Sequence, residues 1–281
     1  MTDLSEGGTL MVSVANRETA NRLVETAIAI ADDRAMQILL LHVVEVPAQI
    51  PLSEGAVLLD EDDAEKRMLS EARSRCEQAG IEAQDHIRYA RDVATGIVGA
   101  IPEHNVDALV MGWRGRPRRR DIILGSFIDR VLAEASCDVF VKRIRQPPDG
   151  IQSILVPVAG GPHCDLSIAL ARTLARQYEA SVSLLHVRSE QSTEGSEGEG
   201  DAFLEQYTDI LEQDSFDLDT EIVYHDHVAG AITDHAAGYD LTILGATREP
   251  FLSRKLIGSV AEGVARSTPS QVILTRRYGE E

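Results

Sequence analysis

Residues 39–45 read LLLHVVE and residues 183–189 read SLLHVRS, so the same apolar run with the same histidine occurs twice, 144 positions apart. The stretch LMVSVAN at 10–16 returns as ILVPVAG at 154–160 with the same spacing. Runs that are apolar over most of their length, between helical patterns, are typical of parallel strands covered on both faces. The repeated strands therefore decide the fold class and predict two copies of one α/β unit.

The repeat continues through the later part of each copy with a second constant spacing. DALVMG at 107–112 matches DLTILG at 240–245, and DVFVKR at 138–143 matches QVILTR at 271–276, both 133 positions apart. One shortening between the second and fourth strands explains the change, because loops tolerate deletions. A duplication of one domain accounts for the whole pattern.

The border between the copies is marked by RQPPDG at 145–150, whose prolines and glycine stop the preceding strand and form a short linker. The predicted domains are residues 1–146 and 151–281. Each is expected to be a flavodoxin-like, Rossmann-like α/β domain with a five-stranded parallel sheet and helices on both faces. In the first copy, alternating strands and helices are predicted at 9–15, 20–33, 37–44, 60–79, 84–90, 93–103, 106–112, 125–136 and 138–143.

The charge is strongly one-sided, with 46 acidic residues, 27 Lys and Arg residues and a formal net charge of −19. Only three of the basic residues are lysines, Lys66, Lys142 and Lys255. This composition resembles that of proteins that work in high salt, where carboxylates keep the surface hydrated; the alternative is an ordinary acidic cytosolic protein. Either reading disfavours nucleic-acid binding, which needs a broad basic face.

The sequence predicts a cytoplasmic protein without a metal site. No apolar run approaches the ~20 residues that a membrane-spanning helix needs. The N-terminal MTDLSEGG lacks the basic and apolar regions of a signal peptide. Cys76, Cys137 and Cys164 are widely separated and show no metal-ligand spacing.

A glycine- and arginine-rich stretch, GWRGRPRRRDIILGS at 112–126, follows the fourth predicted strand. Ligands bind such sheets beyond the carboxyl ends of the strands, near the switch in strand order. Gly112 and Gly115 permit a tight turn, and Gly125-Ser126 opens the next helix, whose free amides and dipole attract anions. No GKS or GKT follows, so this is not a Walker loop. The stretch predicts a phosphate-binding loop of another kind.

The spacing G-x2-G-x9-G-S, with an HV second strand and the duplicated layout, resembles the universal stress protein family over nearly the whole chain. In ATP-binding members this loop cradles the triphosphate, so the resemblance implies ATP or a related adenine nucleotide as ligand and leaves a Mg²⁺ requirement open. It also implies that Val43 faces the adenine. By position, the first site would be lined by Met111, Gly112, Gly115, Gly125, Ser126 and Phe127, and a weaker second site by Gly245, Gly258 and Ser259.

Two departures from the family pattern bear on affinity. ATP-binding members usually end the first strand in an aspartate that helps to hold the nucleoside, but Ala15 and Ala159 stand there in this chain. Loss of such a charged hydrogen bond costs about 1.5–3 kcal/mol, or about 10–100-fold in affinity. In the second copy Arg248 replaces the second glycine of the loop. We therefore expect the first copy to be the better site and the second to be degenerate.

The arginines of the loop and its aromatic residue have two interpretations each. The arginines could supply guanidinium forks for phosphate, or they could be solvated and pair with acidic surface. Trp113 could shield the loop or stack on a base, or it could be an ordinary packed aromatic. The arginines concerned are Arg114, Arg116, Arg118, Arg119 and Arg120.

The histidines are expected to be structural. His42 and His186 recur at equivalent strand ends, which favours a packing role over catalysis. His225 and His227 flank Asp226 in a strand-to-helix turn but lack a third metal-binding partner. Helix capping by Asp226 is the expected role of that turn.

The sequence therefore predicts a stress-response or regulatory nucleotide-binding protein without robust catalysis, and slow ATP hydrolysis stays open. The resemblance implies an internal pseudo-dimer that meets at strands 138–143 and 271–276, and a homodimer stays open. The alternatives are a nucleotide-independent scaffold that contacts protein partners, and the soluble regulatory part of a membrane transporter. An enzyme of the related nucleotide alpha-hydrolase fold would need catalytic groups that the sequence does not offer.

Overall fold

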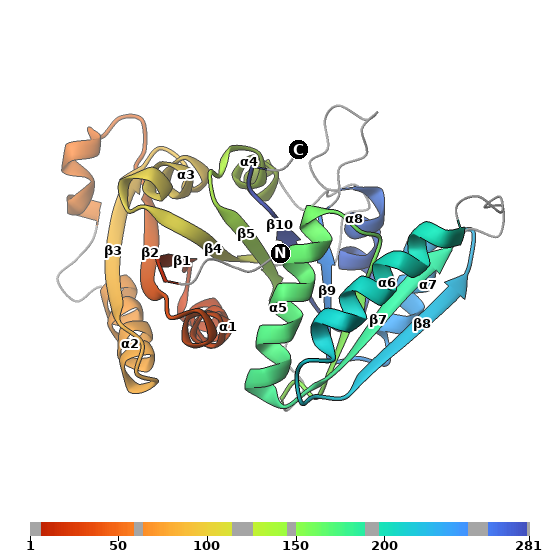
Figure 1. Ribbon diagram of the computed structural model, residues 1–281. Coiled ribbons are helices and arrows are strands. Elements are labelled where there is room, and N and C mark those ends of the chain that lie inside the picture. The colour runs from red at the N-terminus through yellow and green to blue at the C-terminus, as the bar shows by residue number, and fades with distance from the viewer. Residues whose placement is uncertain are drawn as a thin grey trace. The chain divides into compact units, whose positions relative to one another are not determined.

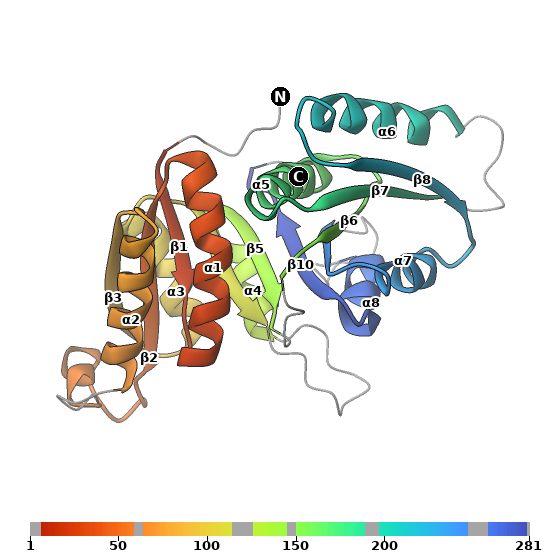
Figure 2. The same cartoon turned by 90° about the horizontal axis from the view of Figure 1, so that it is seen from below.

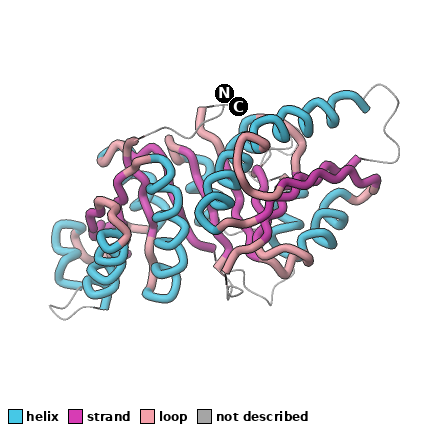
Figure 3. The backbone as a smooth tube through the Cα atoms, turned by 60° about the horizontal axis from the view of Figure 1, so that its bottom comes forward, coloured by secondary structure: helices cyan, strands magenta, loops and turns pink. Residues whose placement is uncertain are grey.

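The protein is described by a computed structural model over residues 7–58, 64–113, 126–144, 150–188, 197–246 and 258–279. These residues divide into two compact units. Among the described residues, the first unit ends at Ile144 and the second begins at residue 150. In each unit strands and helices alternate along the chain (Figure 3).

The first unit contains a five-stranded sheet in the order β3-β2-β1-β4-β5, and all its strand pairs are parallel (Figure 1). Helices α1 and α2 pack together on one face, and α3 and α4 pack together on the other. The elements of this unit are β1 (Thr9–Ser13), α1 (Arg17–Arg34), β2 (Gln37–Glu45), the 3-10 helix η1 (Leu52–Leu58), α2 (Ala64–Gln78), β3 (Ala83–Ala90), α3 (Val93–Glu103), β4 (Val106–Trp113), α4 (Ser126–Glu134) and β5 (Asp138–Arg143).

The second unit repeats this topology with the order β10-β9-β6-β7-β8, again with parallel pairs (Figures 1 and 2). The predicted fold class and the tandem arrangement are thus confirmed. The elements of this unit are β6 (Ser153–Pro157), α5 (Pro162–Tyr178), β7 (Ser181–Arg188), α6 (Glu197–Leu211), β8 (Leu218–Tyr224), α7 (Val228–Ala236), β9 (Leu241–Gly245), α8 (Ser259–Ser267) and β10 (Gln271–Arg276).

The apolar runs at 39–45 and 183–188 form buried strands in the interior of each sheet. Leu40 and Leu41 are successive residues of β2, so their side chains point to opposite faces of the sheet, and both are 0% exposed. Leu184 and Leu185 of β7 are buried in the same way. A strand covered by helices on both faces needs apolar residues at consecutive positions rather than alternate ones.

The excursion between β2 and α2 was not predicted. It contains η1 and is fastened by Arg91, whose guanidinium donates to the carbonyl oxygens of Val46, Pro47 and Ile50 at 3.1, 2.5 and 2.9 Å. One arginine thus binds three carbonyls of a segment that has left the sheet. These hydrogen bonds join residues more than 40 positions apart. No local sequence pattern predicts them.

Candidate functional site

The candidate site lies at the carboxyl edge of the first sheet, where the strand order changes direction between β1 and β4. Strand β1 lies between β2 and β4; the chain leaves β1 toward β2 and leaves β4 toward β5, in opposite directions. Such a divergence leaves a crevice between the two outgoing loops. The carboxyl end of β4 carries Gly112, and Ser126 begins α4. The arginines of the loop, together with Gly115 and Gly125, lie outside the described residues.

His42 holds the end of β1 against β2, and His186 does the same in the second unit. His42 Nδ1 lies 2.8 Å from the carbonyl oxygen of Val14, and His186 Nδ1 lies 2.8 Å from that of Val158. Because a carbonyl only accepts, Nδ1 carries the proton in both rings. The predicted structural role of both histidines is confirmed.

The end of β1 offers no carboxylate to a ligand. Ala15 is exposed, and the side chain of the next residue, Asn16, is used as the N-cap of α1 by accepting the Thr19 amide at 3.0 Å. Ala159 is likewise exposed in the second unit, and no side chain caps α5. At both places the side chain is a methyl group, which cannot replace a carboxylate as a hydrogen-bond acceptor.

The remaining predicted residues of the first site differ in what they can present. Val43 lies within β2 and is only 9% exposed, and a Cβ built on Gly96 of α3 would lie 2.5 Å from its Cγ1. Met111 is 1% exposed, so it can contribute backbone groups but not its side chain. Gly112 is half-buried, and Phe127 is half-buried in the first turn of α4.

Trp113, at the end of β4, is packed rather than free. The guanidinium carbon of Arg143 lies 5.7 Å from the centre of its ring, a cation–π distance. Strand register brings the two residues side by side, because Trp113 pairs with Arg143 across β4 and β5. The interpretation of Trp113 as a packed aromatic is the one that the structure supports.

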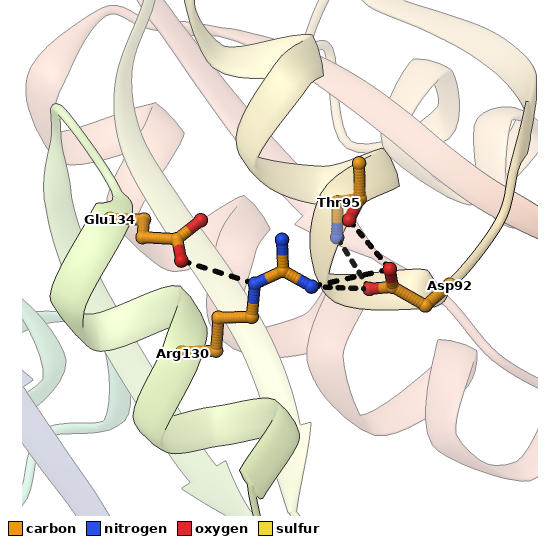
Figure 4. A network of polar contacts seen from close by, with 4 residues as sticks. All are labelled: Asp92, Thr95, Arg130 and Glu134. Carbon is orange, nitrogen blue, oxygen red and sulfur yellow. Dashed lines mark hydrogen bonds and ion pairs between the residues drawn. The ribbon is translucent and has the colours of Figure 1, made fainter.

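A polar clasp, formed by Asp92, Thr95, Arg130 and Glu134, joins the N-terminus of α3 to α4 (Figure 4). Asp92 caps α3 by accepting the Thr95 amide at 2.8 Å and the Thr95 hydroxyl at 2.6 Å. The Arg130 guanidinium donates to both Asp92 oxygens, at 3.1 and 3.2 Å, and to Glu134 at 3.1 Å. The hydrogen bonds from Thr95, supported by Arg130, lower the pKa of Asp92.

The clasp fixes the second turn of the helix whose N-terminus is the candidate phosphate site. Sequence reasoning missed it. The only local signal was Asp92 three residues before Thr95 at the predicted start of a helix. The partner Arg130 is 38 positions further on, and only the packing of α3 against α4 brings it there.

The equivalent turn of the second unit is built differently, and the predicted capping role of Asp226 is wrong. The N-cap of α7 is His227, whose Nδ1 accepts the Gly230 amide at 3.0 Å. The residue directly before the first helical valine is the N-cap in both units, Asp92 before Val93 and His227 before Val228. Asp226 lies one position too early.

The crevice of the second unit is occupied by the chain itself. A Cβ built on Gly160 would lie 2.6 Å from the Phe203 ring of α6, so this ring lies directly against the loop after β6. A Cβ built on Gly245 would lie 2.9 Å from the backbone carbonyl carbon of His163, in the first turn of α5. Gly258 is the N-cap of α8 and Ser259 is exposed, while Arg248 lies outside the described residues.

A polar pair joins α6 to α5 one helical turn after Phe203. The Tyr207 hydroxyl donates to Asp165 at 2.8 Å, and Tyr207 is only 1% exposed. Burial raises the pKa of the Cys164 thiol in the same turn of α5. A buried thiol of raised pKa behaves as a small packed residue rather than as a nucleophile.

Within the described part of the chain, no three His, Cys, Asp or Glu side chains are grouped so that they could hold a metal ion. None of the described helices combines the length and the hydropathy that crossing a bilayer requires.

Comparison with known proteins identifies the family. The universal stress protein family matches residues 8–143 and again residues 150–276. Universal stress protein Rv2623 of Mycobacterium tuberculosis is 24% identical over 287 residues, which cover 95% of this chain and 96% of that protein. A crystal structure of a universal stress protein from Archaeoglobus fulgidus has a TM-score of 0.70 and 17% identity, with 100% of both chains covered.

A transporter is also similar. The Na(+)/H(+) antiporter NhaS5 of Synechocystis is 25% identical over 272 residues, which are 95% of this chain. The chain spans only 38% of the length of that antiporter. Since the family matches both halves of the chain over nearly their whole length, the chain belongs to the universal stress protein family, with two tandem domains.

Proposed function

We propose that the first domain, residues 1–146, binds an adenine nucleotide such as ATP, and that the chain is a regulatory protein of the cytoplasm rather than a robust enzyme. The phosphates would lie at the N-terminus of α4, where unpaired amides and the helix dipole favour negative charge. The observation that carries the proposal is the difference between the two crevices. In the second unit Phe203 lies against Gly160, and a Cβ on Gly245 would meet backbone atoms of α5, whereas the nearest described atoms to a Cβ on Gly112 belong to the side chains of Ile144 and Leu23.

The arrangement of the first site also predicts modest affinity. The clasp links α4 to the start of α3 through Arg130 and Asp92, two partly exposed side chains, so it restrains α4 only weakly. At the nucleoside end, the side chain of Ala15 has no group that could accept a hydrogen bond from ribose or base. We therefore expect a dissociation constant about 10–100-fold weaker than a site with an aspartate there would give. Ala15→Asp is expected to recover that factor.

Calorimetric titration with ATP, ADP and AMP, at low and high salt, tests the nucleotide proposal. Wild type is expected to release heat with at least one nucleotide, and Gly125→Val, which adds a branched side chain directly before α4, is expected to lose it. Gly258→Val is the matched control in the second domain and is expected to bind as wild type does. Absence of heat and of thermal shift at millimolar nucleotide would contradict the proposal and favour the nucleotide-independent scaffold. Normal binding by Gly125→Val would place the site elsewhere.

A second candidate function, regulation of an ion transporter, is favoured by the similarity to NhaS5, which extends over 95% of this chain. The chain would then act on a membrane protein, either as a separate subunit or as part of a longer polypeptide. Photo-cross-linking in the native cells, followed by mass spectrometry of the membrane fraction, tests this. Cross-links to a cation transporter are expected, and recovery of the chain only with soluble proteins would count against this function.

A further inference from the structure

The turn before α7 contains two histidines that both accept backbone hydrogen bonds. His225 Nδ1 accepts the amide of His227 at 2.9 Å, and His227 Nδ1 accepts the amide of Gly230 at 3.0 Å. A Cβ at Gly230 would lie 2.5 Å from His227 Nδ1, so the glycine is what allows the ring to sit on that amide. An imidazole nitrogen that accepts a hydrogen bond carries no proton. Both rings must therefore be neutral for this turn to exist.

The first domain builds the equivalent turn from a group that has no such requirement. Asp92 accepts the Thr95 amide through a carboxylate, and its lowered pKa keeps it ionised in mild acid. At the position of Arg130, which binds Asp92, the second domain has Gly263, and a Cβ there would touch Ala229 at 3.2 Å. The two domains therefore differ at both positions. The first domain has a carboxylate and an arginine, and the second has an imidazole and a glycine.

We propose that His225 and His227 form an acid-sensitive cap, so that protonation of the two rings releases the first turn of α7 while the first turn of α3 is unaffected. Protonation removes the acceptor lone pair at Nδ1 and places positive charge at a helix N-terminus, where the dipole disfavours it. Both effects destabilise the first turn of α7. Because Ala229 in that turn lies against Gly263 of α8, its release also removes a contact from the helix that begins beside Gly258.

The other charged groups near α7 do not replace the cap. His235, in the last turn of α7, donates from Nδ1 to the Ala231 carbonyl at 2.8 Å and lies 3.5 Å from Glu221, so its contacts are made at the opposite end of the helix. A readout at the first turn of α7 therefore separates the cap from His235. The charged or titratable residues on the loop and on the elements packed against it are Asp226, Asp234, His186, Arg188, Asp219, Glu262 and Arg266, of which Glu262 pairs with Arg266 and Arg188 donates to Tyr224.

The test is residue-specific amide exchange by NMR on the full chain between pH 8 and pH 5.5. The protection factor of the Gly230 amide is expected to fall about 10-fold as the pH is lowered, since loss of an N-cap has about that effect. The Thr95 amide, bound by Asp92, is the internal reference and is expected to keep its protection. Nitrogen chemical shifts of the imidazoles report in parallel whether Nδ1 is the unprotonated atom at pH 8.

Exchange of the two caps between the domains makes the test reciprocal. His227→Asp is expected to make protection of Gly230 independent of pH over this range, and Asp92→His is expected to transfer the pH dependence to Thr95. Far-UV circular dichroism at pH 8 confirms that each variant is folded. Constant protection of Gly230 in wild type, or an unchanged acid-induced loss in His227→Asp, would overturn the proposal.

Discussion

Replacing Lys142 with methionine is expected to raise the free energy of unfolding of the first domain by about 2 kcal/mol at pH 7. Lys142 is 5% exposed on β5, and its ammonium group donates to the Thr26 hydroxyl at 2.8 Å and the Arg22 carbonyl at 3.4 Å. Both acceptors are neutral. Burial lowers the pKa of Lys142 from 10.5 to about 8, against the attraction of Glu25. Methionine keeps the length of the side chain and removes the buried charge.

The pH dependence of this effect follows from the direction of the pKa shift. Between about pH 8 and pH 10.5 the unfolded chain holds the lysine proton and the folded chain does not, so the contribution of Lys142 to stability rises with pH over this window. The advantage of Lys142→Met is therefore expected to be full below about pH 8 and to vanish near pH 10.5. The second domain has Thr275 at this position, where its hydroxyl donates to the His163 carbonyl at 2.9 Å. The equivalent position of the second domain is thus filled by a small neutral residue, without a buried charge.

The difference between variant and wild type, rather than the wild-type curve, is the quantity to measure. Burial raises the pKa of Cys76 to about 11, and this thiol makes stability fall with pH over an overlapping window. Urea unfolding followed by fluorescence of Trp113, the one tryptophan of the chain, reports on the first domain. Lys66→Met, at an exposed position on α2, is the matched control and is expected to change stability by less than about 0.5 kcal/mol. A destabilised Lys142→Met at pH 7 would contradict the prediction.

How much the sequence could predict depends on whether a feature is local. Helix α3 was predicted with the bounds that the structure gives it, because Asp92 before an apolar run is a local start signal. Helix α1 begins at Arg17, three residues before the predicted start at residue 20, because Asn16 caps it and apolar periodicity alone does not mark a capped but polar first turn. The domain bounds at 146 and 151, the pairing of the two domains and a homodimer stay predictions.

The candidate site was predictable only in part for the same reason. The glycine spacing that begins at Gly112 can be read along the chain, and so can the missing aspartate at Ala15. The contact of Phe203 with Gly160 and the clasp between Asp92 and Arg130 both join elements that are far apart in sequence. Such contacts depend on which helices the sheet brings together, and a single sequence does not encode that as a local pattern. The phosphate-lining role of Gly115 and Gly125 stays a prediction.

The two glycines at equivalent positions near the carboxyl ends of β4 and β9, Gly112 and Gly245, are expected to respond differently to the same substitution. Gly245→Ala should lower the free energy of unfolding of the second domain by about 2–3 kcal/mol. Its Cβ would lie 2.9 Å from the carbonyl carbon of His163 and 3.1 Å from the Cys164 amide nitrogen, and backbone atoms at the start of α5 cannot move without disturbing the helix. The cost comes from steric overlap alone and not from backbone strain, because Gly245 does not have a positive φ.

Gly112→Ala should be close to neutral, within about 1 kcal/mol. Its Cβ would meet the ends of Ile144 and Leu23 at 3.2 and 3.3 Å, and flexible side chains can yield by a few tenths of an ångström. Alanine also reduces the entropy of the unfolded chain, which offsets part of the remaining cost by about 0.4–1 kcal/mol. Residue-specific amide exchange in the central strands β1 and β6 separates the stabilities of the two domains. Equal losses in both variants would show that the glycine at the end of β4 is as tightly packed as that of β9, and would remove the contrast in space on which a ligand site in the first domain alone depends.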